Sequence, residues 1–237
     1  MKRIFISISI LLVLNTLIFA EGKKVTLRQN NYYLDSKVVF YEYKKYGELN
    51  KEIQKNIVEP FNLFVTEKKQ EWDEYDKIRQ ETQAEGVTDS SVSTYASLKS
   101  PKFEYKTFCD KKIEGKKYIS LLYKNYTFLG GAHGDSTLYT VLFNKEENKI
   151  INIEEISNLS LQEISKLCFD ELIAKIKDTE KYTPERIEWI KEGTLPVEDN
   201  FMKFTFNEKN KTLTVYFEQY TVAPYSDGIQ LVEIKLN

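Results

Sequence analysis

The spacing of hydrophobic and polar residues changes several times along the chain. Residues 34–46 are rich in β-branched and aromatic side chains, which predicts a strand ending before Gly47. From Glu48 the apolar residues recur every three or four positions, which predicts a helix with one buried face. These residues are Leu49, Ile53, Ile57, Phe61, Phe64 and Val65. Pro60 is expected to kink or divide this helix, and the charged stretch 67–83 to extend it or form a second helix.

The second half of the chain returns to strand-like patterns. Small polar residues fill 85–101 and predict a loop near an internal boundary. We expect strands at 102–110, 116–129, 136–144, 149–153, 201–206, 213–217 and 229–236. A helix is expected from Ser160 to Lys177, with Ser160 and Glu163 forming a capping box, and Pro184 is expected to open a shorter one.

Strands and helices that do not alternate regularly indicate an α+β fold. We therefore predict largely antiparallel sheets packed with a few helices in two small subdomains. Their predicted limits are 21–100 for an N-terminal strand–helix subdomain and 101–237 for a C-terminal α+β domain.

The first 20 residues have the layout of a secretory signal peptide. Lys2 and Arg3 precede an apolar run that ends at the small residue Ala20. Cleavage before Glu21 would leave no stable membrane span and would place the mature protein in the periplasm or outside the cell. The alternative is an uncleaved anchor, although the run is at the lower limit for crossing a hydrocarbon core of about 30 Å.

Composition and charge narrow the classes of function. Hydrophobic residues make up 41% of the chain and charged residues 30%, which is typical of a folded globular protein. Loss of the two cations in the signal changes the formal charge from −2 to −4, so no basic face is expected to bind nucleic acid. Cys109 and Cys168 could form a disulfide in an oxidising compartment, but we favour two free thiols, with Cys168 buried on its predicted helix.

One short segment stands out as candidate chemistry, Gly130-Gly131-Ala132-His133-Gly134-Asp135, between two predicted strands. Three glycines in five positions indicate backbone at positive φ or in close contact with another group. His133 is the only histidine, which excludes a multi-histidine metal site. The segment is either a ligand-binding loop or a tight connection in which the imidazole bonds the backbone. We predict no cofactor and no metal, and we assign no catalytic residue.

Two segments carry a family resemblance. The first is the glycine-rich motif at 130–135. The second is 215–228, whose last six residues, Ala223-Pro224-Tyr225-Ser226-Asp227-Gly228, form the second motif. Residues 102–237 resemble an extracytoplasmic domain of unknown function, the domain-of-unknown-function 3298 family. That family is found in RsiV-like anti-sigma factors and beside the deacetylase domain of PdaC-like proteins. Residues 38–79 are more weakly similar to the PdaC-like N-terminal domain that usually lies upstream. The resemblance implies a partner at the envelope, either a lysozyme-like protein or peptidoglycan.

Three hypotheses of function follow from the motifs and the resemblance. The leading one is an exported, non-enzymatic cell-envelope domain that binds a protein or a cell-wall glycan. Its candidate ligand-binding residues are Gly130, Gly131, His133, Gly134, Tyr225 and Asp227. The alternatives are a hydrolase using His133 with Asp135 or Asp227, and a structural component of the envelope. We also expect the two motifs to lie close together in space, with His133 facing the second motif.

Overall fold

The fold is described by a computed structural model, which covers residues 22–84 and 102–236. The expected signal peptide and the expected loop 85–101 lie outside these residues. Within the two described stretches, no helix is long and apolar enough to cross a membrane.

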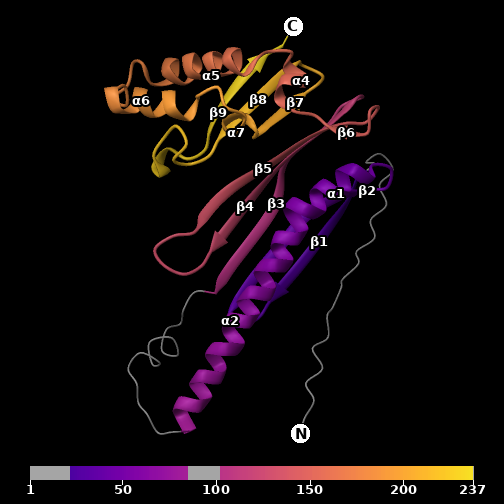
Figure 1. The fold of residues 1–237 in the computed structure, drawn as a ribbon, viewed down its shortest axis with the longest axis vertical. Coiled ribbons are helices and arrows are strands. Elements are labelled where there is room, and N and C mark those ends of the chain that lie inside the picture. Colours follow the sequence, from indigo (N-terminus) through magenta and orange to yellow (C-terminus); the bar gives the residue numbers. More distant parts are fainter. Residues whose placement is uncertain (1–21, 85–101, 237) are drawn as a thin grey trace.

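A six-stranded sheet forms the larger layer of the molecule (Figure 1). Its strands, which follow chain order, are β1 (Gly22–Asn30), β2 (Leu34–Tyr43), β3 (Phe103–Glu114), β4 (Tyr118–Phe128), β5 (Asp135–Asn144) and β6 (Lys149–Ile150). All neighbours are antiparallel except β2 and β3, which are parallel. Parallel neighbours need a long crossover connection, and the helices between β2 and β3 provide it.

The crossover helix continues through Pro60, so of the two expected effects, a kink or a division, the division is wrong. It consists of α1 (Gly47–Ile53), a π-helical turn (Gln54–Val58) and α2 (Glu59–Ala84). The Glu59 N–H bonds the Gln54 carbonyl five residues back. Since proline has no N–H to bond the carbonyl four residues back, a wider π turn just before it lets the helix continue. α2 then extends well past the end of the sheet (Figure 1).

A smaller antiparallel sheet and four α-helices form the C-terminal part. The strands, in sheet order, are β7 (Phe204–Asn207), β8 (Thr212–Phe217) and β9 (Gln230–Lys235). The helices are α4 (Ile153–Ser157), α5 (Leu161–Ile176), α6 (Pro184–Gly193) and α7 (Glu198–Phe201), and a 3-10 turn covers Tyr225–Asp227. The capping box at Ser160 and Glu163 is confirmed, as is a helix opening at Pro184.

Two expected strands are shorter than the apolar runs suggested. The expected strand 149–153 ends at Ile150, because Asn152 and Glu155 form a capping box that starts α4 at Ile153. The expected strand 201–206 begins only at Phe204, since Phe201 closes α7. In both cases the misassigned apolar residue is buried, but from a helix.

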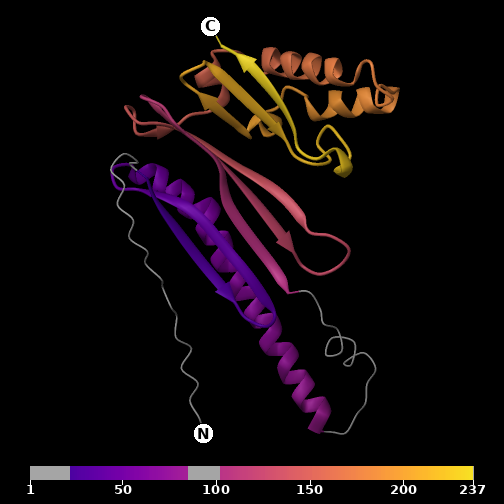
Figure 2. The ribbon, with the colours of Figure 1, turned by 180° about the vertical axis from the view of Figure 1, so that it is seen from behind.

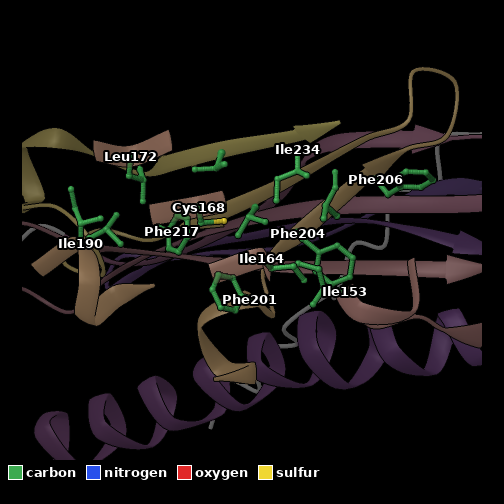
Figure 3. Close-up of a cluster of buried hydrophobic side chains, with 14 of the residues drawn as sticks. Ile153, Ile164, Cys168, Leu172, Ile190, Phe201, Phe204, Phe206, Phe217 and Ile234 are labelled. Atoms are coloured by element: carbon green, nitrogen blue, oxygen red, sulfur yellow. The ribbon is translucent and has the colours of Figure 1, made fainter. Parts of the chain in front are cut away.

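Two hydrophobic cores lie on opposite faces of the central strands. One joins α1 and α2 to the large sheet through residues such as Leu49, Ile53 and Tyr123. The other joins α5, α6 and α7 to the small sheet, and Figure 3 shows Cys168 among its aliphatic and aromatic side chains. β4 and β5 carry near-continuous apolar runs because they are covered on both faces.

The small sheet lies beside the large sheet (Figure 2). Hydroxyl groups of the large sheet cap the edge strand of the small one, β7. The Phe206 N–H donates to Ser120 Oγ at 3.0 Å, and the Phe204 N–H donates to Thr140 Oγ1 at 3.0 Å. β7 pairs with β8 on its other side. The two hydroxyls therefore satisfy N–H groups that an exposed edge strand would leave unpaired.

The two cysteines are free and belong to different cores, which agrees with the favoured expectation. Cys168 is fully buried on α5, and burial raises the pKa of its thiol to about 12. Cys109 is partly buried on β3, and burial raises its thiol pKa to about 11. Both thiols are therefore protonated and unreactive near neutral pH.

The α+β class with largely antiparallel sheets is confirmed. The boundary expected near residues 100 and 101 stays a prediction. Strands from both sides of it share the large sheet, through the pairing of β2 with β3.

Candidate functional site

The first motif forms the loop of the β4–β5 hairpin. Gly130 and Gly131 have φ of 93° and 101°, a conformation that side chains other than glycine rarely adopt. Gly134 is buried, and a Cβ atom there would lie 2.5 Å from the Tyr126 ring. The glycines thus allow a sharp turn at one end and close packing on Tyr126 at the other, which leaves His133 exposed on the loop.

The second motif is a turn held by an ion-pair cluster. The Asp227 carboxylate binds Lys181 Nζ and an Arg186 guanidinium nitrogen, each at 2.9 Å. Its side chain is only 13% exposed and that of Arg186 12%, so the second pair is largely shielded from water. Lys181, followed by Arg186, holds the pKa of Asp227 below its ordinary value. Asp227 therefore fixes the turn against the start of α6.

The two motifs lie against each other, as expected from the sequence. The rings of His133 and Tyr225 are 4.9 Å apart between centroids and 33° apart in tilt. The Tyr225 hydroxyl donates to the Gly134 carbonyl at 3.4 Å. The side chain of His133 therefore faces the second motif.

A third ring extends this contact into a row. Tyr220 is 57% exposed, and its ring lies 5.8 Å from that of Tyr225. Tyr220 has a φ of 67°, a strained value for a residue with a side chain. Its N–H donates to the Ala223 carbonyl, and its carbonyl accepts from Trp189 Nε1. We call His133, Tyr225 and Tyr220 the aromatic surface.

The catalytic alternative needs His133 beside an acidic partner. His133 Nδ1 lies 3.1 Å from the Gly134 carbonyl oxygen. None of the hydrogen bonds and ion pairs recorded for residues 22–84 and 102–236 joins His133 to Asp135 or Asp227. Asp135 begins β5 opposite Thr127, and Asp227 is bound by two cations. No group of three or more His, Cys, Asp or Glu side chains in the described stretches could hold a metal.

A cavity of about 290 Å³ opens next to the aromatic surface, and no pattern in the sequence indicated it. It lies between one face of β3, β4 and β5 and the segment that carries the second motif. Its lining residues are Phe108, Lys124, Asn125, Tyr126, Ser136, Thr137, Leu138, Gln219, Gly228 and Ile229. A larger groove of about 760 Å³, bordered by α4, α5 and β9, contains none of the motif residues.

The ion-pair cluster makes a pH-dependent contribution to stability. We expect Asp227→Asn to lower the free energy of unfolding by about 2 kcal/mol at pH 7, through lost charge-assisted hydrogen bonds. Because the folded pKa of Asp227 is lowered, this contribution is present above the ordinary pKa of 3.8 and is lost as the pH falls further. Thermal unfolding of both forms from pH 7 to pH 3 measures the difference.

The matched control is Asp170→Asn on α5, which removes an exposed pair with Lys166. Such pairs contribute about 0–1 kcal/mol. If the difference in free energy of unfolding between wild type and Asp227→Asn is the same at pH 3 as at pH 7, this account of Asp227 is contradicted.

Comparisons with known proteins agree with the family resemblance. Residues 142–237 match the family model described as a protein of unknown function, DUF3298. The match includes the second motif and begins after the hairpin loop. The chain is also 26% identical over 120 residues to the peptidoglycan-N-acetylmuramic acid deacetylase PdaC of Bacillus subtilis, an alignment covering 51% of this chain and 25% of that protein. The chain thus spans about a quarter of the length of this relative.

Two crystal structures of DUF3298 proteins have the same overall fold. A member from Bacteroides fragilis superposes with a TM-score of 0.58 at 16% identity, covering 91% of this chain and 90% of that one. A member from Pseudomonas aeruginosa superposes with a TM-score of 0.54 at 11% identity, covering 91% and 88%.

Proposed function

We propose that this chain, whose C-terminal part matches the DUF3298 family, works outside the cytoplasm as a non-enzymatic binding domain of the cell envelope. Its proposed ligand is the glycan of the cell wall. The observation that carries the proposal is the aromatic surface, in which the exposed rings of His133 and Tyr220 adjoin the half-buried ring of Tyr225.

Adjoining rings at a surface suit a sugar chain. Tyrosine and histidine combine a flat apolar face with polar atoms at the edge. The flat C–H faces of pyranose rings pack on such faces, and the sugar hydroxyl groups bond the polar edges. The Bacillus subtilis relative is named as a deacetylase of peptidoglycan N-acetylmuramic acid, which supports a glycan of this kind as the ligand.

Each candidate residue has a separate part in this proposal. Gly130, Gly131 and Gly134 shape the loop, while His133 and Tyr225 contact the glycan. Asp227 acts indirectly, by holding the turn through Lys181 and Arg186. Since Asp227 is occupied in this way, the geometry favours binding over hydrolysis by His133 with Asp227.

We expect Tyr220→Ala and His133→Ala to weaken binding of the mature chain to purified peptidoglycan by about tenfold each, the equivalent of 1.4 kcal/mol. Both side chains are exposed, so the melting temperature should change little. Co-sedimentation with insoluble peptidoglycan measures binding. Tyr32→Ala is the matched control, because Tyr32 is a 69% exposed tyrosine on the β1–β2 turn.

The same proteins, tested for capture of lysozyme, separate the glycan from a protein partner. If wild type binds lysozyme but not peptidoglycan, and Tyr220→Ala no longer captures lysozyme, the ligand is a protein and not the glycan. Release of reducing sugars from peptidoglycan, abolished by His133→Ala, would instead establish the hydrolase alternative. Wild type that binds neither ligand would favour a structural role.

A further inference from the structure

We infer that the cavity beside the aromatic surface binds one N-acetylated hexopyranose unit, an inference that rests on the proposed function. The cavity and the aromatic surface are contiguous. Gln219, at the cavity wall, directly precedes Tyr220 and donates from Nε2 to the Tyr225 carbonyl at 3.3 Å. Tyr126, which lines the cavity, packs on Gly134, the residue after His133.

The walls offer apolar faces to a ring-shaped ligand. Phe108 is 44% exposed although it lies on the same side of the sheet as the buried Leu138. Tyr126 and Ile229 complete the apolar part of the lining. A flat ligand with C–H groups on its faces would cover Phe108 and remove this apolar surface from water.

The polar groups of the cavity call for a neutral ligand that donates hydrogen bonds. Gln219 Oε1 is buried and has no hydrogen-bond partner among the described residues. Because Gln219 Nε2 is held by the Tyr225 carbonyl, the amide is oriented with its oxygen free to accept. The amide N–H of an acetamido group supplies such a donor.

Charge in the cavity is already balanced, which argues against an anionic ligand. Lys124, the one cation in the lining, forms an ion pair with Asp110 at 3.1 Å. The other polar side chains of the lining are uncharged at neutral pH. A sugar unit without charge fits these partners better than a phosphate or a carboxylate.

Volume limits the ligand to one unit. Small-molecule sites generally measure roughly 300–1,000 Å³, and this cavity, at about 290 Å³, lies at the lower end. A longer glycan therefore places one sugar in the cavity, and its neighbours continue along the aromatic surface.

The test compares the N-acetylglucosamine trimer with the glucosamine trimer by titration calorimetry, at physiological salt to screen the ammonium groups. We expect wild type to bind the acetylated trimer about tenfold more tightly, as the loss of one well-placed hydrogen bond implies. Gln219→Leu should remove this preference. Ser136→Met, which fills the cavity and leaves Gln219 in place, should weaken binding of the acetylated trimer by a similar factor.

The outcomes separate the cavity from the aromatic surface. Folded Gln219→Leu and Ser136→Met that bind the acetylated trimer like wild type would overturn the inference, as would equal binding of the two trimers. If peptidoglycan binding then still falls in Tyr220→Ala, the proposed function stands without the cavity. If Gln219→Leu and Ser136→Met lose trimer binding but Tyr220→Ala does not, the cavity is supported as the binding site and the aromatic surface is rejected as one. Wild type that binds neither trimer nor peptidoglycan would reject both.

Discussion

Replacing Gly193 by alanine should lower the free energy of unfolding by about 3 kcal/mol, near the upper end for overpacking of a buried site. Gly193 is buried at the end of α6. A Cβ atom there would lie 2.2 Å from the Thr221 carbonyl oxygen and 2.6 Å from a Val222 methyl group. The first of these atoms belongs to the backbone, so the segment itself must move.

This movement would also affect the proposed binding surface, because Thr221 directly follows Tyr220. Urea denaturation followed by tryptophan fluorescence measures the stability, and peptidoglycan co-sedimentation of the folded fraction measures the displacement of Tyr220. Gly47→Ala is the matched control. A Cβ at Gly47 meets nothing within 4 Å at the start of α1, so this change should be neutral or stabilising by about 0.5–1 kcal/mol. Equal stabilities of the two variants would contradict the packing argument.

The sequence predicted elements well where the local chemistry was specific. Ser160 and Glu163 define the start of α5 because each satisfies a backbone N–H of the other. A strand was predicted at 116–129 from its strand-like pattern, and β4 in the structure packs on both of its faces.

β1 was missed because an edge strand needs little hydrophobic signal. Only Val25 and Leu27 are large apolar residues in Gly22–Asn30, and Lys23, Lys24 and Arg28 suit an exposed edge. Its conformation depends on pairing with β2, which a local pattern does not report. Ile153 and Phe201 were misassigned for a related reason, since short apolar runs do not distinguish a strand from a helix.

Some features of the candidate site were also predicted from the sequence, and others were not. Glycines at positive φ marked the hairpin loop, and its contact with the second motif was predicted correctly. The partners of Asp227 were not predicted, because Lys181 lies in the loop before α6 and Arg186 lies on α6, both far from Asp227 in the sequence. Gln219 lies in the segment 215–228 but was not singled out there, and Ser136 belongs to neither motif. Only the packing of the second motif over the sheet brings them to one cavity.

The junction between the two sheets should depend on two hydroxyl groups. We expect the double variant Ser120→Ala/Thr140→Ala to lower the free energy of unfolding by about 2–5 kcal/mol. Each substitution leaves one N–H of β7 without its acceptor, and an unsatisfied buried donor costs about 1–3 kcal/mol. Ser120 is 1% exposed, so water cannot replace its hydroxyl, and Ser120→Ala should account for the larger share.

Urea denaturation of the single and double variants measures these losses. Thr137→Ala is the control. Thr137 lies on β5, like Thr140, but it is exposed and caps no residue of β7. The two N–H groups belong to Phe204 and Phe206, whose rings lie in the C-terminal core. That core should therefore loosen together with the junction, and Trp189 on α6 should report the change. If the double variant is as stable as Thr137→Ala, the hydroxyls do not hold β7 against the large sheet. The two sheets would then be held by their other contacts, which are the apolar packing of Leu122, Leu138 and Tyr216 and hydrogen bonds such as those from the Lys117 and Tyr118 N–H groups to Glu208.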